Sequence, residues 1–133
     1  MDNSAQITID WREGTVDLAE AQQEALTRTL MQALRQVDEV ISVMRVADAD
    51  VPEGGMGVGD WLWGLLTTEI PGDGIKEAIK VALEEVFERL PGKPVDVTIE
   101  IDGRKIALGR VRPQDIDAVG EKAVALAQKL KDV

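Results

Sequence analysis

The sequence predicts an α+β fold: a four-stranded mixed sheet with helices packed mainly on one face. Three observations predict it. The length of 133 residues is the usual size of one domain. Apolar residues alternate with polar ones in some segments, as in half-buried strands, and recur at helical spacing in others. We therefore expect a single α+β domain over residues 1–133, with the element order β-α-β-α-α-β-β-α.

The first three elements are a strand, a helix and a strand. Apolar and polar residues alternate over residues 7–11, which predicts a half-buried strand. A helix is expected over residues 17–37, with Asp17 as its N-cap and an apolar stripe in its second half. Residues 40–46 are apolar on both alternating sets, which predicts an internal strand covered on both faces. Short connections between these elements predict a parallel crossover.

The middle of the chain begins with a glycine-rich segment over residues 52–59, which we expect to be a flexible loop. Asp60 can cap a short apolar helix over residues 61–70, which Pro71 would end. A second helix is expected over residues 75–90, because its apolar residues form one clear stripe.

A hairpin is the best local signal in the last part of the chain. Residues 95–101 alternate strictly, the Asp102-Gly103 pair is typical of a two-residue turn, and residues 104–110 form the returning strand. Pro113 can then open a final amphipathic helix. The expected register pairs Ile99 with Ile106, Val97 with Leu108, and Glu100 with Lys105.

The composition excludes several kinds of catalytic and metal site. The chain has no His and no Cys, so disulfides, thiolate nucleophiles, histidine metal sites and Ser-His-Asp or Cys-His catalysis are all ruled out. An acidic loop at Asp48, Asp50 and Glu53 lacks the spacing of an EF-hand. We therefore predict no enzyme, no cofactor and no metal. An enzyme that uses carboxylates alone remains an alternative, although no spacing singles out a catalytic pair.

The charge of the chain limits its partners. With 25 acidic and 15 basic side chains, the formal net charge is −10, which argues against binding to nucleic acid or to an anionic membrane surface. Residues 1–60 hold 12 acidic and 4 basic side chains, a net charge of −8, so an electrostatic partner of this half should be basic. The first residues lack the features of a signal peptide, which predicts a cytoplasmic location.

The glycine-rich segment is one candidate site. Gly54–Gly59 precedes a predicted helix, and backbone amides in such a place can bind phosphate. However, Asp60 follows where a phosphate-binding motif needs Lys and Ser or Thr, or a further Gly. A small-ligand or nucleotide-binding module that uses this loop is therefore the alternative function, beside a plain flexible connection.

The tryptophan-rich segment that follows is the second candidate. A helix this short cannot bury both indole rings and the neighbouring leucines on one face. Either the domain surrounds the segment, or one side of it binds a partner, since Trp is enriched in binding hot spots. The predicted interface residues are Met56, Trp61, Leu62, Trp63 and Leu66.

The layout of residues 26–112 resembles the effector-associated constant component family of bacterial conflict systems. The resemblance depends on the order of its parts rather than on a chemical motif. These parts are the apolar helix of residues 26–37, the strand of residues 40–46, the segment V-P-E-G-G-M-G at 51–57, the leucine-rich residues 61–66, the helix ending near Leu90, and the hairpin V-D-V-T-I-E-I-D-G-R-K-I at 95–106, which is similar to the family's V-x-V-x-I-x-x-D-G-R-x-I.

This resemblance implies a non-catalytic adaptor or assembly domain. Its partner would be an effector, commonly a caspase-like or trypsin-like peptidase, in a system of defence against phage. The family brings no catalytic residues. Self-association is a separate question, because either residues 104–110 or residues 7–11 could form a sheet edge, and the sequence does not order the strands.

Overall fold

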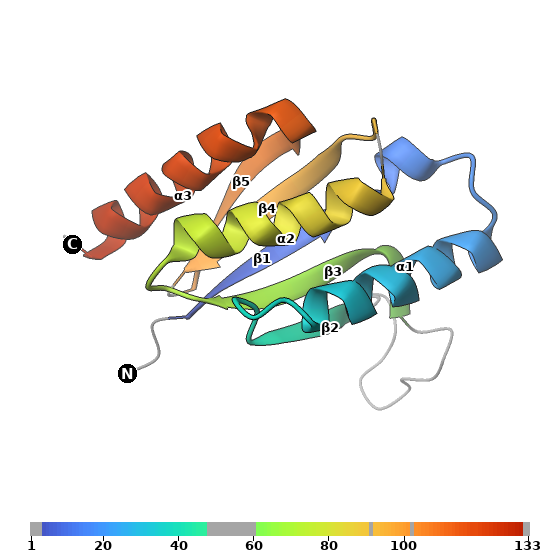
Figure 1. The fold of residues 1–133 in the computed structure, drawn as a ribbon, viewed down its shortest axis with the longest axis horizontal. Coiled ribbons are helices and arrows are strands. Elements are labelled where there is room, and N and C mark those ends of the chain that lie inside the picture. The colour runs from blue at the N-terminus through green and yellow to red at the C-terminus, as the bar shows by residue number, and fades with distance from the viewer. Residues whose placement is uncertain (1–3, 48–60, 91, 102, 132–133) are drawn as a thin grey trace.

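The computed structural model describes residues 4–47, 61–90, 92–101 and 103–131. Within these residues five strands form one sheet, and three α-helices cover one of its faces, so the α+β class is confirmed (Figure 1). Short 3₁₀ turns precede the first and the last helix. The elements are β1 (Ser4–Asp10), α1 (Glu20–Arg35), β2 (Ser42–Ala47), β3 (Trp61–Pro71), α2 (Ile75–Arg89), β4 (Val95–Ile101), β5 (Arg104–Val111) and α3 (Ile116–Lys131).

The strands lie in the order β2-β3-β1-β4-β5, and every neighbouring pair is antiparallel. Each of the first two helices therefore joins two strands that run in the same direction, with one antiparallel strand between them. α1 connects β1 to β2 across β3, and α2 connects β3 to β4 across β1. This is the split β-α-β topology of ferredoxin-like folds, extended here by β5 and α3.

The predicted four-stranded mixed sheet is wrong in two respects. Residues 61–70 form strand β3 rather than a helix, which changes the element order and gives five strands. The sheet is also antiparallel throughout rather than mixed, because β3 lies between β1 and β2. Burial along β3 has a period of two. Leu66 and Ile70 are fully buried beneath the helices. Thr67 and Glu69, which lie between them in the strand, are only partly buried. The almost wholly apolar start of the segment hides this alternation, and a short apolar run does not distinguish a strand from a buried helix.

The strand that was expected to be internal is also placed differently. β2 is an edge strand, with β3 on one side only. Val43 is buried, whereas Met44 and Ile41 are exposed. Of these three residues only Val43 is buried, so the apolar character of the segment does not reflect cover on both faces.

The core lies between the sheet and the helices. β1 is the central strand, and its alternate residues Ile7 and Ile9 are fully buried, as predicted. α2 contributes the predicted stripe, with Ile79 and Leu83 fully buried. α1 begins three residues after the expected cap, and Gln22 Oε1 accepts a hydrogen bond of 2.9 Å from the amide of the residue before the helix.

The β4–β5 hairpin follows the predicted register at two of three pairs. Ile99 lies opposite Ile106, and Glu100 lies opposite Lys105 with 3.8 Å between the charged atoms. Val97 pairs with Gly109 instead of the residue before it, since a bulge shifts the register there. Gly109 has φ +82°, which favours glycine, so the bulge has a local sequence cause.

A polar cluster around Trp11 joins β1 to α1. The buried indole donates to Gln23 Oε1 at 2.9 Å, and Gln23 Nε2 donates to Thr15 Oγ1 at 2.7 Å. The Thr15 hydroxyl donates in turn to the Trp11 carbonyl at 2.8 Å. These bonds satisfy the polar atoms that burial of the indole would otherwise leave unpaired.

Gly64 connects this cluster to β3. Its carbonyl accepts a bond of 2.9 Å from the Trp11 amide, and its own amide donates to Thr27 Oγ1 at 2.9 Å. Gly64 has φ +96°, and a methyl group added there would overlap Arg12 Cγ. Glycine therefore fits this position, because the backbone is in the left-handed region and lies too close to Arg12 for a side chain.

Candidate functional site

The two edge strands of the sheet differ in how their free sides are protected. β5 carries exposed cationic side chains at Arg104, Lys105 and Arg110, and it is bent by the bulge at Gly109. Charges and bulges are the devices that keep another strand from pairing with an edge. The β5 edge is therefore protected against strand addition.

The β2 edge carries fewer charges than β5, although its pairing with β3 also has a register shift between Arg45 and Ala47. Its six residues include one charged side chain, Arg45. Met44 is 45% exposed, and Ile41, directly before the strand, is 57% exposed. An edge that combines apolar side chains with few charges is a template for pairing with a further strand.

The backbone of β2 also has hydrogen-bonding groups on its free side. The Val43 carbonyl accepts from Arg35 Nη2 of α1 at 3.4 Å, so this carbonyl points away from β3. In an antiparallel strand the backbone groups of every second residue point to the same side, which places those of Arg45 there too. A distance of 3.4 Å is long for a hydrogen bond, so the Arg35 side chain is a weak cover for this carbonyl.

A groove of about 470 Å³ runs along this free side. α1 lies above it on the helix-covered face of the sheet, as Figure 1 shows for α1 and β2. Its lining combines thioether and aliphatic groups with two guanidinium groups. The lining residues are Met31, Arg35, Val43, Met44 and Arg45.

Two of the residues that line the groove are arginines, although this half of the chain is acidic. Residues 1–60 contain four basic side chains, and two of them, Arg35 and Arg45, line the groove. The other two, Arg12 and Arg28, form ion pairs with carboxylates of their own segments. The pKa of Arg12 is raised by its hydrogen bond to the neighbouring carboxylate, although burial acts in the opposite direction.

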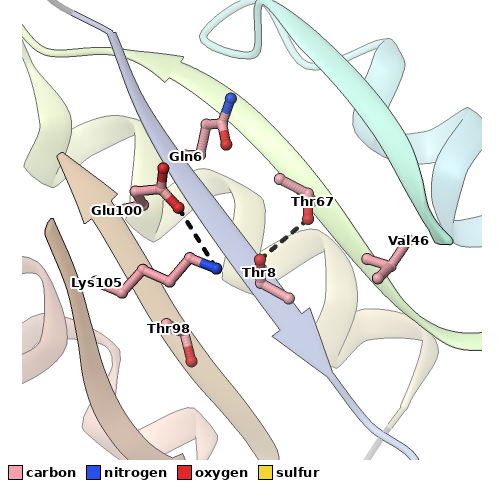
Figure 2. A pocket seen from close by; sticks show the side chains of 7 residues that line it. All are labelled: Gln6, Thr8, Val46, Thr67, Thr98, Glu100 and Lys105. Atoms are coloured by element: carbon pink, nitrogen blue, oxygen red, sulfur yellow. Dashed lines mark hydrogen bonds and ion pairs between the residues drawn. The ribbon is translucent and has the colours of Figure 1, made fainter. Parts of the chain in front are cut away.

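The face of the sheet opposite the helices is polar. Figure 2 shows a pocket of about 340 Å³ there, in which the Thr8 and Thr67 hydroxyl groups lie 3.0 Å apart. Lys105 Nζ lies 3.8 Å from a carboxylate oxygen of Glu100. These polar groups interact with each other, so the pocket offers few unengaged groups to orient a ligand.

The described part of the chain shows no metal centre. None of its acidic residues form a group of three or more that could hold a metal ion. None of the helices in this part is long and apolar enough to cross a membrane.

The predicted interface residues differ in where they lie and in whether the structure describes them. Met56 and the whole Gly54–Gly59 loop lie outside the described residues. The backbone of residues 61–63 begins β3, where Trp61 pairs with Ala47 at the end of β2. Leu66 is fully buried under the helices, so it belongs to the core and not to a surface. For the tryptophans the interface remains a prediction, now located beside the end of the β2 edge.

Sequence reasoning missed the groove residues of α1 and β2. Arg35 was not singled out, and Met44 was assigned to a buried strand. One signal was present: Ser42 and Arg45 interrupt the apolar pattern of β2, and charged side chains are rare in strands buried on both faces. That signal could have identified β2 as an edge.

No family model, no curated protein and no solved structure matches this chain. The resemblance to the effector-associated family therefore stays a prediction from the order of sequence features.

Proposed function

We propose that this chain is a non-catalytic adaptor or assembly domain that binds a protein partner through the free edge of β2. The contrast between the two edges carries this proposal. β5 has three exposed cationic side chains, whereas β2 has one charged residue, and Met44 and the preceding Ile41 are exposed at its edge. Pairing of a partner segment with a sheet edge is a general mode of protein recognition.

The sequence resemblance supplies the kind of partner. We propose an effector protein, such as a caspase-like or trypsin-like peptidase of a bacterial conflict or anti-phage system. The adaptor would bind the effector and contribute no catalytic group, in keeping with a chain that has neither His nor Cys.

A matched pair of lysine substitutions tests this function. Met44→Lys places a charge on the exposed side of the β2 edge, and Ala107→Lys does the same on β5, where Ala107 is also exposed. Binding of each purified variant to the effector encoded beside this chain would be measured by calorimetry.

Met44→Lys should weaken binding about tenfold or more, equivalent to at least about 1.4 kcal/mol, because a charge beside the edge opposes pairing with another strand. Ala107→Lys should leave binding unchanged. Equal losses in the two variants, or no binding by the unaltered chain, would contradict the proposal.

The alternative of nucleotide binding by Gly54–Gly59 has a separate test. Nucleotide at about 100 times its dissociation constant would add about 2.7 kcal/mol of stability. A thermal-shift panel of nucleotides without any shift would remove this alternative.

A further inference from the structure

We infer that the partner contributes an extended segment in which apolar and acidic side chains alternate, and that this segment adds to β2 as a sixth strand. The inference rests on the proposed function and names the chemistry of its partner. It is drawn from the β2 groove, where backbone groups, exposed apolar side chains and two guanidinium groups lie together.

The two faces of β2 present different chemistry to such a strand. Arg45 pairs with Leu66, which is buried beneath the helices, so Arg45 lies on the helix-covered face. Met44 pairs with Thr67, which lines the pocket on the opposite face. Side chains of a paired strand also alternate between the two faces, so one set would lie beside Met44 and the other beside Arg45.

The set on the helix-covered face would lie beside the guanidinium group of Arg35. This side chain extends from α1, and its Nη2 lies 3.4 Å from the Val43 carbonyl. A carboxylate placed there can accept charge-assisted hydrogen bonds from a guanidinium group. A lysine at the same position would meet like charge.

The net charge of −10 does not prevent an acidic segment from binding at this place. Charges farther away than about 8 Å are largely screened at physiological ionic strength. The side chains inside the groove therefore decide the preference.

A second copy of this chain fits the groove less well. The β2 sequence S-V-M-R-V-A contains no acidic residue, so a β2 strand from another copy would bring an arginine instead of a carboxylate. The partner segment is therefore expected to come from a different protein.

The probe is a blocked seven-residue peptide of alternating valine and glutamate, titrated into the full chain and followed by NMR shifts of the β2 amides. A valine–lysine peptide tests the charge, and a valine–glutamate peptide with N-methylated backbone on its pairing side tests strand addition. Arg35→Gln is compared with Arg28→Gln, which makes the same charge change on α1 outside the groove lining.

We expect the valine–glutamate peptide to bind at least tenfold more tightly than either control peptide. Arg35→Gln should remove most of the preference for glutamate over lysine, and Arg28→Gln should leave it within about twofold. These results would support the inference.

Equal affinity for the glutamate and lysine peptides, or no binding of the glutamate peptide, would overturn the inference. Self-association of the chain that Met44→Lys abolishes would also overturn it, since a second copy would then be the occupant. If the effector still binds in the Met44 and Ala107 test, the adaptor function survives this failure. If the effector does not bind, the proposed function fails as well.

Discussion

Substitution of Gly64 by alanine should destabilise the protein strongly, because this residue meets two separate restrictions. Its φ of +96° lies in the left-handed region, which costs a residue with a side chain about 1–3 kcal/mol. The added methyl group would also overlap Arg12 Cγ. Relief of that overlap must shift either Arg12 or the Gly64 backbone.

A shift of the backbone would weaken two hydrogen bonds of 2.9 Å each, from the Trp11 amide to Gly64 and from Gly64 to Thr27. Each is worth about 1 kcal/mol net. Together with the conformational cost, Gly64→Ala should lower the free energy of unfolding by about 3–5 kcal/mol. For a domain of this size the melting temperature should fall by roughly 10–20 °C.

Gly109→Ala is the matched control. Gly109 also lies in a strand with positive φ, +82°, but an added methyl group there would meet nothing within 4 Å. Urea unfolding of both variants, followed by tryptophan fluorescence and by circular dichroism, measures the difference. Gly64→Ala should cost about 2 kcal/mol more than its control. Equal costs would refute the close-packing explanation.

Three further substitutions test other contacts by urea unfolding. Thr68→Val should stabilise the fold by about 1 kcal/mol, since the buried Thr68 hydroxyl has no partner among the described residues; a loss of stability would show that the hydroxyl is in fact satisfied. Trp11→Phe should cost about 2 kcal/mol because it leaves Gln23 Oε1 without its indole donor, and a cost near zero would contradict this. Lys105→Glu should cost about 0.5 kcal/mol by placing like charges opposite each other at Glu100, with a smaller cost at 1 M salt; no dependence on salt would count against a charge effect.

The parts of the fold that the sequence predicts are those with local patterns. The alternation in residues 7–11 and 95–101, the turn at Gly103 and the stripe of α2 each depend on neighbours within one element or one hairpin. Such patterns are sufficient to predict that an element exists and which of its faces is buried.

The segment at residues 61–70 shows where local patterns fail. Its first six residues are apolar or glycine, so neither period is visible, and a helix was expected in place of β3. Tertiary pairing decides the outcome: β3 lies between β1 and β2 and bonds to both. The order of strands depends on such contacts between distant residues, so the edge position of β2 was not predicted.

The candidate site follows the same division. The composition limits the chemistry only in part: a chain without His or Cys cannot use imidazole or thiolate groups. The groove at Arg35 and Met44, however, exists only because α1 and β2 lie side by side at the edge of the sheet. No spacing along the sequence brings these two residues together.

The central claim is that the β2 edge binds a partner strand, and amide hydrogen exchange tests it most directly. Exchange would be measured for the full chain alone and with its effector. The account predicts that the Val43 and Arg45 amides, which share the free side of β2 with the Val43 carbonyl, become protected on binding, while the β5 amides do not change. Protection at β5, or unchanged exchange at Val43 and Arg45 in the complex, would contradict it.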